Sequence, residues 1–173
     1  MAARTARSRL MLDARSWTLE RQDVQGRRGV MGRTEDRWKN LEVWRLADEF
    51  VLETYRATRQ FPGEELYGIT SQLRRAVVSV PTNIVEGYSR RGDRELVRFL
   101  EIALGSLGES KYLLHLSHRL DYLSGDEYER LLAQADRVGQ KLYRFYETVS
   151  KGAATRPRTP RPRRSSRRRA SSL

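Results

Sequence analysis

The sequence has 173 residues, a net charge of +12 at neutral pH and no cysteine. This length suggests one domain with enough chain to bury a single hydrophobic core. The lack of cysteine excludes a disulfide framework and a cysteine-based zinc site, and no run of about 18 apolar residues predicts a membrane-spanning helix. A reducing, cytoplasmic setting is the simplest interpretation.

The positive charge is concentrated outside the centre of the chain. Residues 1–36 carry eight arginines and five acidic residues, and residues 152–173 carry eight arginines and no acidic residue. Residues 37–151 have a net charge of only +1, from 18 basic and 17 acidic residues. A basic balance is typical of proteins that bind nucleic acid or an anionic surface. That inference applies first to the C-terminal tail and only weakly to the central domain.

The N-terminal segment, residues 1–36, shows no helical or strand periodicity, and we expect a disordered head. Its acid-free, arginine-rich start is similar to a transit peptide. The preferred hypothesis concerns Met31, which stands just before the regular part of the chain. If Arg27 and Arg28 are encoded by AGG codons, they form a bacterial ribosome-binding site, and residues 1–30 are then an untranslated leader.

Four amphipathic helical patterns follow, with apolar residues three and four positions apart. Asn40 and Asp93 are candidate N-caps for the first and third helices. Ser124 and Glu127 form a candidate capping box at the start of the fourth. The predicted helices cover residues 40–60, 64–88, 93–122 and 124–151.

The short connections between these helices favour antiparallel neighbours. The predicted fold is therefore an all-α antiparallel four-helix bundle over residues 37–151. The third helix has more apolar residues than one core seam needs, which predicts a subunit interface on it. The residues off its main stripe are Phe99, Ile102, Leu104, Leu113 and Leu116.

Pro81 lies in the middle of the second helical pattern, where a proline costs about 3 kcal/mol. The apolar and polar stripes both stay in phase across it, which favours one continuous helix kinked at Pro81. We expect a hydroxyl from Ser79 or Thr82, or a water, to bond to the freed carbonyl of Val77. The alternative is a break at Val80, because a residue before proline is biased away from helix.

No catalytic triad, Cys-His pair or phosphate-binding glycine loop is recognisable, so we predict neither an enzyme nor a cofactor. The glycines of "GSLGES", residues 105–110, lie in a helical pattern and are expected to let another helix approach closely. His115 and His118 are interpreted as surface or interface residues, because the Glu-x-x-His motif of di-iron bundles is absent. No metal site is predicted.

The candidate nucleic-acid contacts are arginines, whose planar guanidinium suits bidentate phosphate binding. The alternative for the domain is pairing with nearby acids, for example of Glu86 with Arg90. For Arg75 and Glu86, an ion pair across a subunit contact is favoured. The candidates in the domain are Arg74, Arg75, Arg90, Arg91, Arg94 and Arg98.

The tail, residues 152–173, is rich in Arg, Pro and Ser and is expected to be disordered. It is interpreted either as a phosphate-binding arm or as a product of compositional bias, since arginine outnumbers lysine 30 to 4. The candidate contacts in it are Arg163, Arg164, Arg167, Arg168 and Arg169.

Three segments resemble a known family: "LEVWRLADEF", "YGITSQLRRAVVSVPTNIVEGYSRR" and "RFLEIALGSLGESKYLL". They look like the bacterial four-helix bundle proteins first noticed as open reading frames in intervening sequences of 23S rRNA genes, over about Arg37 to Lys151. The resemblance implies assembly into a five-fold ring, and nucleic-acid binding as reported for some members. A relative, the accessory variability protein of diversity-generating retroelements, partners a reverse transcriptase.

These observations together predict a non-enzymatic homo-oligomer, expected to be a pentamer, that binds the backbone of RNA or DNA with little selection of sequence. The alternative is a protein-interaction adaptor that docks a partner such as a reverse transcriptase.

Overall fold

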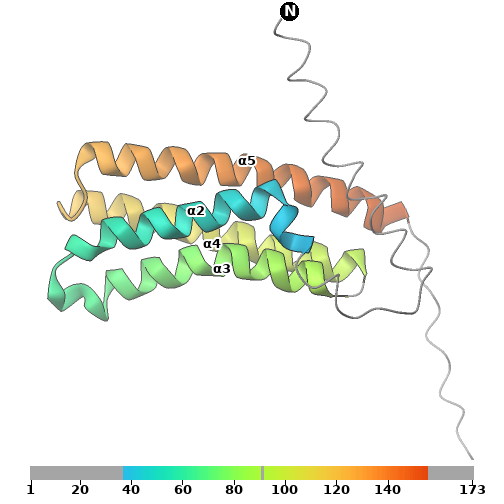
Figure 1. Cartoon of the computed structure of the whole chain (residues 1–173), viewed down its shortest axis with the longest axis horizontal. Coiled ribbons are helices and arrows are strands. Elements are labelled where there is room, and N and C mark those ends of the chain that lie inside the picture. The colour runs from blue at the N-terminus through green and yellow to red at the C-terminus, as the bar shows by residue number, and fades with distance from the viewer. Residues whose placement is uncertain (1–36, 91, 156–173) are drawn as a thin grey trace, which may run out of the picture.

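The structure is a computed structural model that describes residues 37–90 and 92–155. Within these residues it contains four long helices and no strand, which confirms the predicted all-α four-helix bundle (Figure 1). The predicted disordered head, and residues 156–173 of the predicted tail, lie outside the described residues. The long helices are α2 (Glu42–Ala57), α3 (Ile69–Ser89), α4 (Asp93–Arg119) and α5 (Gly125–Thr155), and the short 3-10 helices are η1 (Arg37–Asn40), η2 (Thr58–Gln60) and η3 (Gly63–Leu66).

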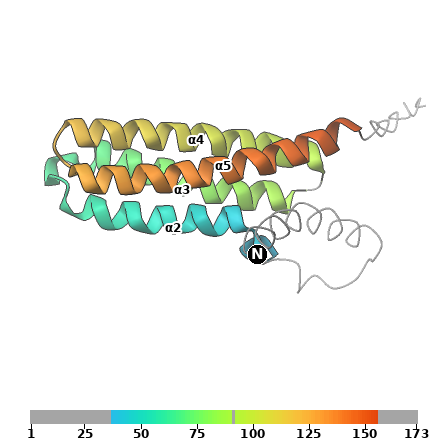
Figure 2. The ribbon, with the colours of Figure 1, turned by 90° about the horizontal axis from the view of Figure 1, so that it is seen from above.

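Each long helix packs against two others. Helix α2 contacts α3 and α5, and α4 contacts the same two helices from the other side. Figures 1 and 2 show that the start of α2, the connection from α3 to α4 and the end of α5 lie at the same end of the bundle. We call this end, marked by Glu42, Ser89, Asp93 and Thr155, the α3–α4 end.

The helix limits differ from the predicted ones by a few residues. Helix α3 begins at Ile69 rather than near Glu64, because a carboxylate oxygen of Glu65 accepts the backbone N–H of Ile69 at 2.9 Å and so satisfies one donor of the first turn. Helix α5 continues to Thr155, past the predicted end at Lys151. Smaller shifts occur elsewhere: α2 begins at Glu42 instead of Asn40, and α4 ends at Arg119 instead of Tyr122.

The capping box predicted at the start of the fourth helix is confirmed. The Ser124 hydroxyl oxygen accepts the backbone N–H of Glu127 at 3.3 Å, and the Glu127 carboxylate accepts the backbone N–H of Ser124 at 3.2 Å. The Ser124 hydroxyl also donates to this carboxylate at 2.8 Å, which is the main reason that the pKa of Glu127 lies below its ordinary value. Gln60 donates to the same carboxylate at 2.7 Å and ties η2 to the start of α5.

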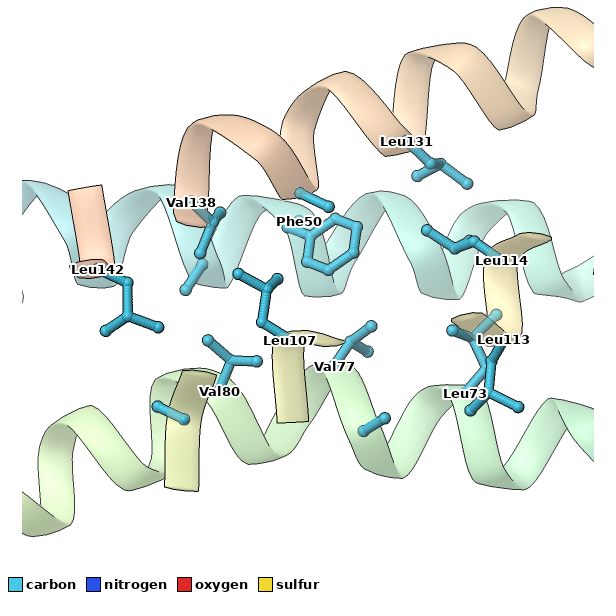
Figure 3. Close-up of a cluster of buried hydrophobic side chains, with 14 of the residues drawn as sticks. Phe50, Leu73, Val77, Val80, Leu107, Leu113, Leu114, Leu131, Val138 and Leu142 are labelled. Carbon is cyan, nitrogen blue, oxygen red and sulfur yellow. The ribbon is translucent and has the colours of Figure 1, made fainter. Parts of the chain in front are cut away.

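The hydrophobic core runs along the bundle axis between the four helices. Figure 3 shows apolar side chains from every long helix meeting there, among them Phe50 of α2, Val77 of α3, Leu114 of α4 and Leu142 of α5, all fully buried. Because the core draws on all four helices, no helix can leave without exposing apolar surface.

Of the five residues predicted to form a surplus apolar face on α4, only Ile102 is exposed, and Leu104 and Leu116 pack against the core. Leu113 was assigned to this face wrongly, because this side chain is only 5 % exposed and belongs to the core. Ile102 is 43 % exposed, and the others are half-buried: Phe99, Leu104 and Leu116.

Helix α3 passes through Pro81 without interruption, which confirms the continuous helix and excludes the break at Val80. Neither of the two hydroxyls predicted to bond to the freed carbonyl of Val77 does so. The Thr82 hydroxyl donates to the carbonyl of Val78 at 2.8 Å, and the Ser79 hydroxyl pairs with a hydroxyl of α4.

Ion pairs join α2 to α5 on the surface of the bundle. Lys141 contacts Glu42 at 2.7 Å, and Arg130 pairs with Glu53. Hydrogen bonds from Arg130 and Arg56 to the Glu53 carboxylate hold its pKa below the ordinary value. In the described part of the chain, no helix combines the length and the apolar character that crossing a bilayer requires.

The continuous path of α3 predicts the effect of replacing its proline. Pro81→Ala restores a backbone donor for the Val77 carbonyl but removes buried ring carbons, so we expect the free energy of unfolding to rise by roughly 1 kcal/mol. Urea unfolding followed by circular dichroism measures this change. A loss of helical signal in the folded variant would contradict the continuous helix.

Candidate nucleic-acid interface

The connection from α3 to α4 is built around two glycines. Gly92 precedes α4 with a φ of +106°, a backbone conformation that residues with a side chain rarely adopt. Gly87, in the last turn of α3, lies against α4, and a Cβ added there would be 2.7 Å from the Cβ of Phe99. Only glycine permits this close approach, which therefore sets where α4 begins relative to α3.

Arg90 is held in place at the end of α3. Its guanidinium pairs with Glu86 one turn earlier and lies 5.7 Å from the centre of the Phe99 ring. This confirms the predicted pairing of Glu86 with Arg90. Because the side chain is still 56 % exposed, it remains accessible at the surface of the α3–α4 end.

Arg94 and Arg98, unlike Arg90, form no ion pair within the part of the chain that the structure describes. They are exposed and lie four residues apart on one face of α4. Arg98 does not pair with Glu101 one turn later, which instead accepts a hydrogen bond from the Tyr146 hydroxyl at 3.2 Å. That bond is the main cause of the raised pKa of Tyr146.

Arg74 has an internal role that weakens it as a phosphate contact. Its Nε donates to the Thr58 hydroxyl at 2.9 Å, and one Nη donates to the Thr58 carbonyl at 3.3 Å. The guanidinium also lies 4.9 Å from the centre of the Tyr55 ring. Arg74 therefore fastens the start of α3 to the end of α2.

Arg75 is exposed but lies far along α3 from Arg90 and the start of α4. Fifteen residues of helix separate it from Arg90, which corresponds to about 22 Å along α3. The predicted ion pair of Arg75 with Glu86 spans eleven residues of the same helix, so it can form only between two copies of the chain. Arg91 and the tail arginines, Arg163, Arg164, Arg167, Arg168 and Arg169, lie outside the described residues.

The glycines of the "GSLGES" segment do not serve the predicted close approach within this chain. Gly105 and Gly108 are exposed, and a Cβ at either would meet no described atom within 4 Å. Ser106 of this segment contacts α3, because its hydroxyl lies 2.8 Å from the Ser79 hydroxyl.

The two histidines are placed as surface and packing residues. His118 stacks on Tyr128 with ring centres 4.8 Å apart, and its Nδ1 lies 3.1 Å from the Leu123 carbonyl oxygen. His115 is exposed. The part of the chain that the structure describes contains no group of three or more side chains suited to hold a metal ion.

Sequence reasoning missed Gly87, although a signal for it exists. Gly87 follows Val80 and Ile84 at helical spacing, so it continues the apolar stripe of α3. A glycine at such a position costs helix stability, and close packing is the reason that compensates for it.

Comparisons with known proteins agree with this architecture. A family model described as 23S rRNA-intervening sequence protein matches residues 39–144. A crystal structure of a protein of unknown function from the S23 ribosomal protein family of Bacteroides thetaiotaomicron is 22% identical, with a TM-score of 0.57. The match covers 61% of this chain and 95% of that one. No curated protein matches the chain.

The packing at Gly87 yields a prediction with a matched control. Gly87→Ala forces α3 and α4 apart, and we expect it to lower the free energy of unfolding by about 1–3 kcal/mol. Gly105→Ala makes the same chemical change at an exposed helical site and should raise stability by about 0.5–1 kcal/mol. Chemical denaturation of both variants measures the difference, and equal effects would refute the packing role of Gly87.

Proposed function

The chain belongs to the 23S rRNA-intervening sequence protein family, and from this premise we propose that it is a non-enzymatic bundle that binds the nucleic-acid backbone. Binding is electrostatic, with little selection of base sequence. The function needs no cofactor, and the contacts are made by arginines of the α3–α4 end and of the C-terminal tail.

The observation that carries this proposal is the position of the cations. Arg94 and Arg98 are exposed on the first turns of α4. Helix α5 ends at Thr155 at the same end of the bundle (Figures 1 and 2), and eight arginines follow it in residues 156–173. One end of the molecule therefore combines two exposed arginines on a helix with the start of a strongly basic segment.

The distribution of charge supports binding without base readout. Asp93 and Glu95 alternate with the cations at the start of α4 and reduce the local positive potential. The folded part thus contributes few phosphate contacts, whereas the tail can contribute many. Phosphate contacts supply affinity that falls with salt but does not depend on sequence.

Assembly into a homo-oligomer would increase the number of helix-borne arginines at one surface. The exposed Ile102 of α4, together with the family resemblance, favours a homopentamer. In a cyclic oligomer each subunit presents its own Arg94 and Arg98, so that a modest local charge becomes a rim of arginines.

A second candidate function is that of a protein-interaction adaptor. Large side chains on α4 and α5 are exposed, with Tyr112 at 62 % and Tyr143 at 53 %. Aromatic surface of this kind suits a protein partner. The resemblance to the retroelement accessory protein suggests a reverse transcriptase as that partner.

The salt dependence of binding tests the proposed function. On duplex DNA the log-log slope of affinity against salt is about 0.9 per neutralised phosphate. Removing residues 156–173, which leaves α5 intact, should flatten the slope strongly. Arg94→Gln with Arg98→Gln should reduce it by at most about two units. Fluorescence anisotropy with labelled RNA and DNA, measured over a series of salt concentrations, gives each slope.

Two controls separate charge from other effects. Replacing the eight tail arginines with lysine retains the charge and should keep most of the affinity. Arg137→Gln with Arg144→Gln removes two exposed cations from α5 and should change binding less than the α4 pair. If neither the tail nor the α4 variant binds RNA or DNA differently from the unaltered chain at low salt, the adaptor function replaces this proposal.

The oligomeric state is tested separately. A homopentamer of 20.2 kDa chains has a mass of about 101 kDa. We expect light scattering coupled to size-exclusion chromatography at micromolar concentration to give this mass, since apolar surface on α4 stabilises the assembly. A mass equal to that of one chain would contradict both the ring and the repeated rim of arginines.

A further inference from the structure

A groove runs between α2 and α3 towards the α3–α4 end, and it encloses about 620 Å³. Its lining is mainly apolar and includes Val51, Val78 and Pro81. Trp38 and Trp44 form one side, with ring centres 4.4 Å apart and planes inclined at 68°. Pro81 thus helps to line a surface groove as well as forming part of a helix.

The groove is also lined by two acidic residues and one basic residue. Asp48 and Glu86 line it together with Arg90, and Arg90 pairs with Glu86. Asp48 is half-buried and has no ion-pair partner among the residues that the structure describes. A carboxylate without a partner beside two indole rings favours a cationic occupant, because both groups attract a guanidinium.

The sequence contains a segment with matching chemistry immediately after α5. Residues 156–164 read "RPRTPRPRR". Proline-rich segments favour the polyproline II helix, which has three residues per turn. At that period Pro157 and Pro160 share one ridge, while Arg158, Arg161 and Arg164 share the next. Grooves lined by aromatic residues recognise such proline ridges.

The position of the helix ends allows this segment to reach the groove. Helix α5 ends at Thr155 at the α3–α4 end of the bundle (Figures 1 and 2). The groove reaches the same end, because Ser89 and Arg90 at the end of α3 line it. Nine residues of polyproline II helix extend about 28 Å. Packed helices are about 8–10 Å apart, so a segment of this length can pass from α5 across α2.

We propose that residues 156–164 of this chain dock in the groove between α2 and α3. The proline ridge lies against Trp38, Trp44 and Pro81, and an arginine of the neighbouring ridge pairs with Asp48. Docking leaves Arg167, Arg168 and Arg169 outside the groove, at the same end of the molecule as Arg94 and Arg98. The inference concerns contacts within the protein, so its test does not require that the chain bind nucleic acid.

A disulfide tests the docking directly, because the chain has no cysteine of its own. Ser89 is exposed and lines the groove, and Thr159 lies between Pro157 and Pro160 of the segment. In the full-length variant Ser89→Cys with Thr159→Cys, we expect a disulfide between positions 89 and 159 on mild oxidation. The matched control, Glu95→Cys with Thr159→Cys, places the first cysteine at an exposed site of the same end but outside the groove.

The groove pair should cross-link at least about tenfold faster than the control pair, because docking raises the effective concentration of the segment. Adding Asp48→Asn should slow the groove pair, whereas Glu49→Gln, an exposed neighbour outside the groove, should not. Peptide mapping identifies each disulfide, and non-reducing electrophoresis shows whether it joins two chains. A bond from position 89 to position 159 of the same chain supports docking. Equal rates for the two pairs would overturn the proposal. So would a bond between position 89 of two chains, since a second copy would then occupy the groove.

Discussion

The close packing of α3 against α4 at Gly87 is the constraint on which the candidate interface depends. A hydrogen atom in place of a side chain lets Phe99 approach the α3 backbone, and Arg90 can then lie over the same ring. The path by which α4 leaves the turn follows from this contact. The packing therefore sets where α4 begins, and with it the position of Arg94 and Arg98. Arg90, which contacts Glu86 and Phe99, lies at the same turn.

The fold and the excess charge occupy different parts of the chain. Ion pairs such as those of Glu42 with Lys141 and of Glu53 with Arg130 use the charges of the bundle to join its helices. The surplus of arginine lies in the segments before and after the bundle. A nearly neutral scaffold can therefore keep a mainly apolar groove, lined also by the acidic Asp48, that extends towards the end of the bundle where a strongly basic segment begins (Figure 1).

Periodicity and capping chemistry predict most of this fold, because each depends on residues close together in the sequence. The box of Ser124 and Glu127 is an example, since both partners lie in one turn. The site is less predictable. Arg74 bonds to Thr58 across two short 3-10 helices whose path no periodic pattern specifies, and the pairing of Trp38 with Trp44 depends on how η1 folds back on α2. Contacts between elements, which the sequence pattern does not specify, thus decide that a polar residue such as Arg74 bonds within the bundle.

Four helix–helix contacts, here called seams, hold the bundle together: α2 with α3, α3 with α4, α4 with α5, and α2 with α5. The seam between α2 and α5 joins residues that are much further apart in the sequence than those of the other three. Its ion pairs join residues 77 and 99 positions apart, whereas the other seams join consecutive helices. Closing so long a loop costs more chain entropy than forming a hairpin of neighbouring helices. We therefore expect this seam to form last during folding and to open first during unfolding. The kinetic lifetime of the native bundle then depends on how firmly α5 holds α2.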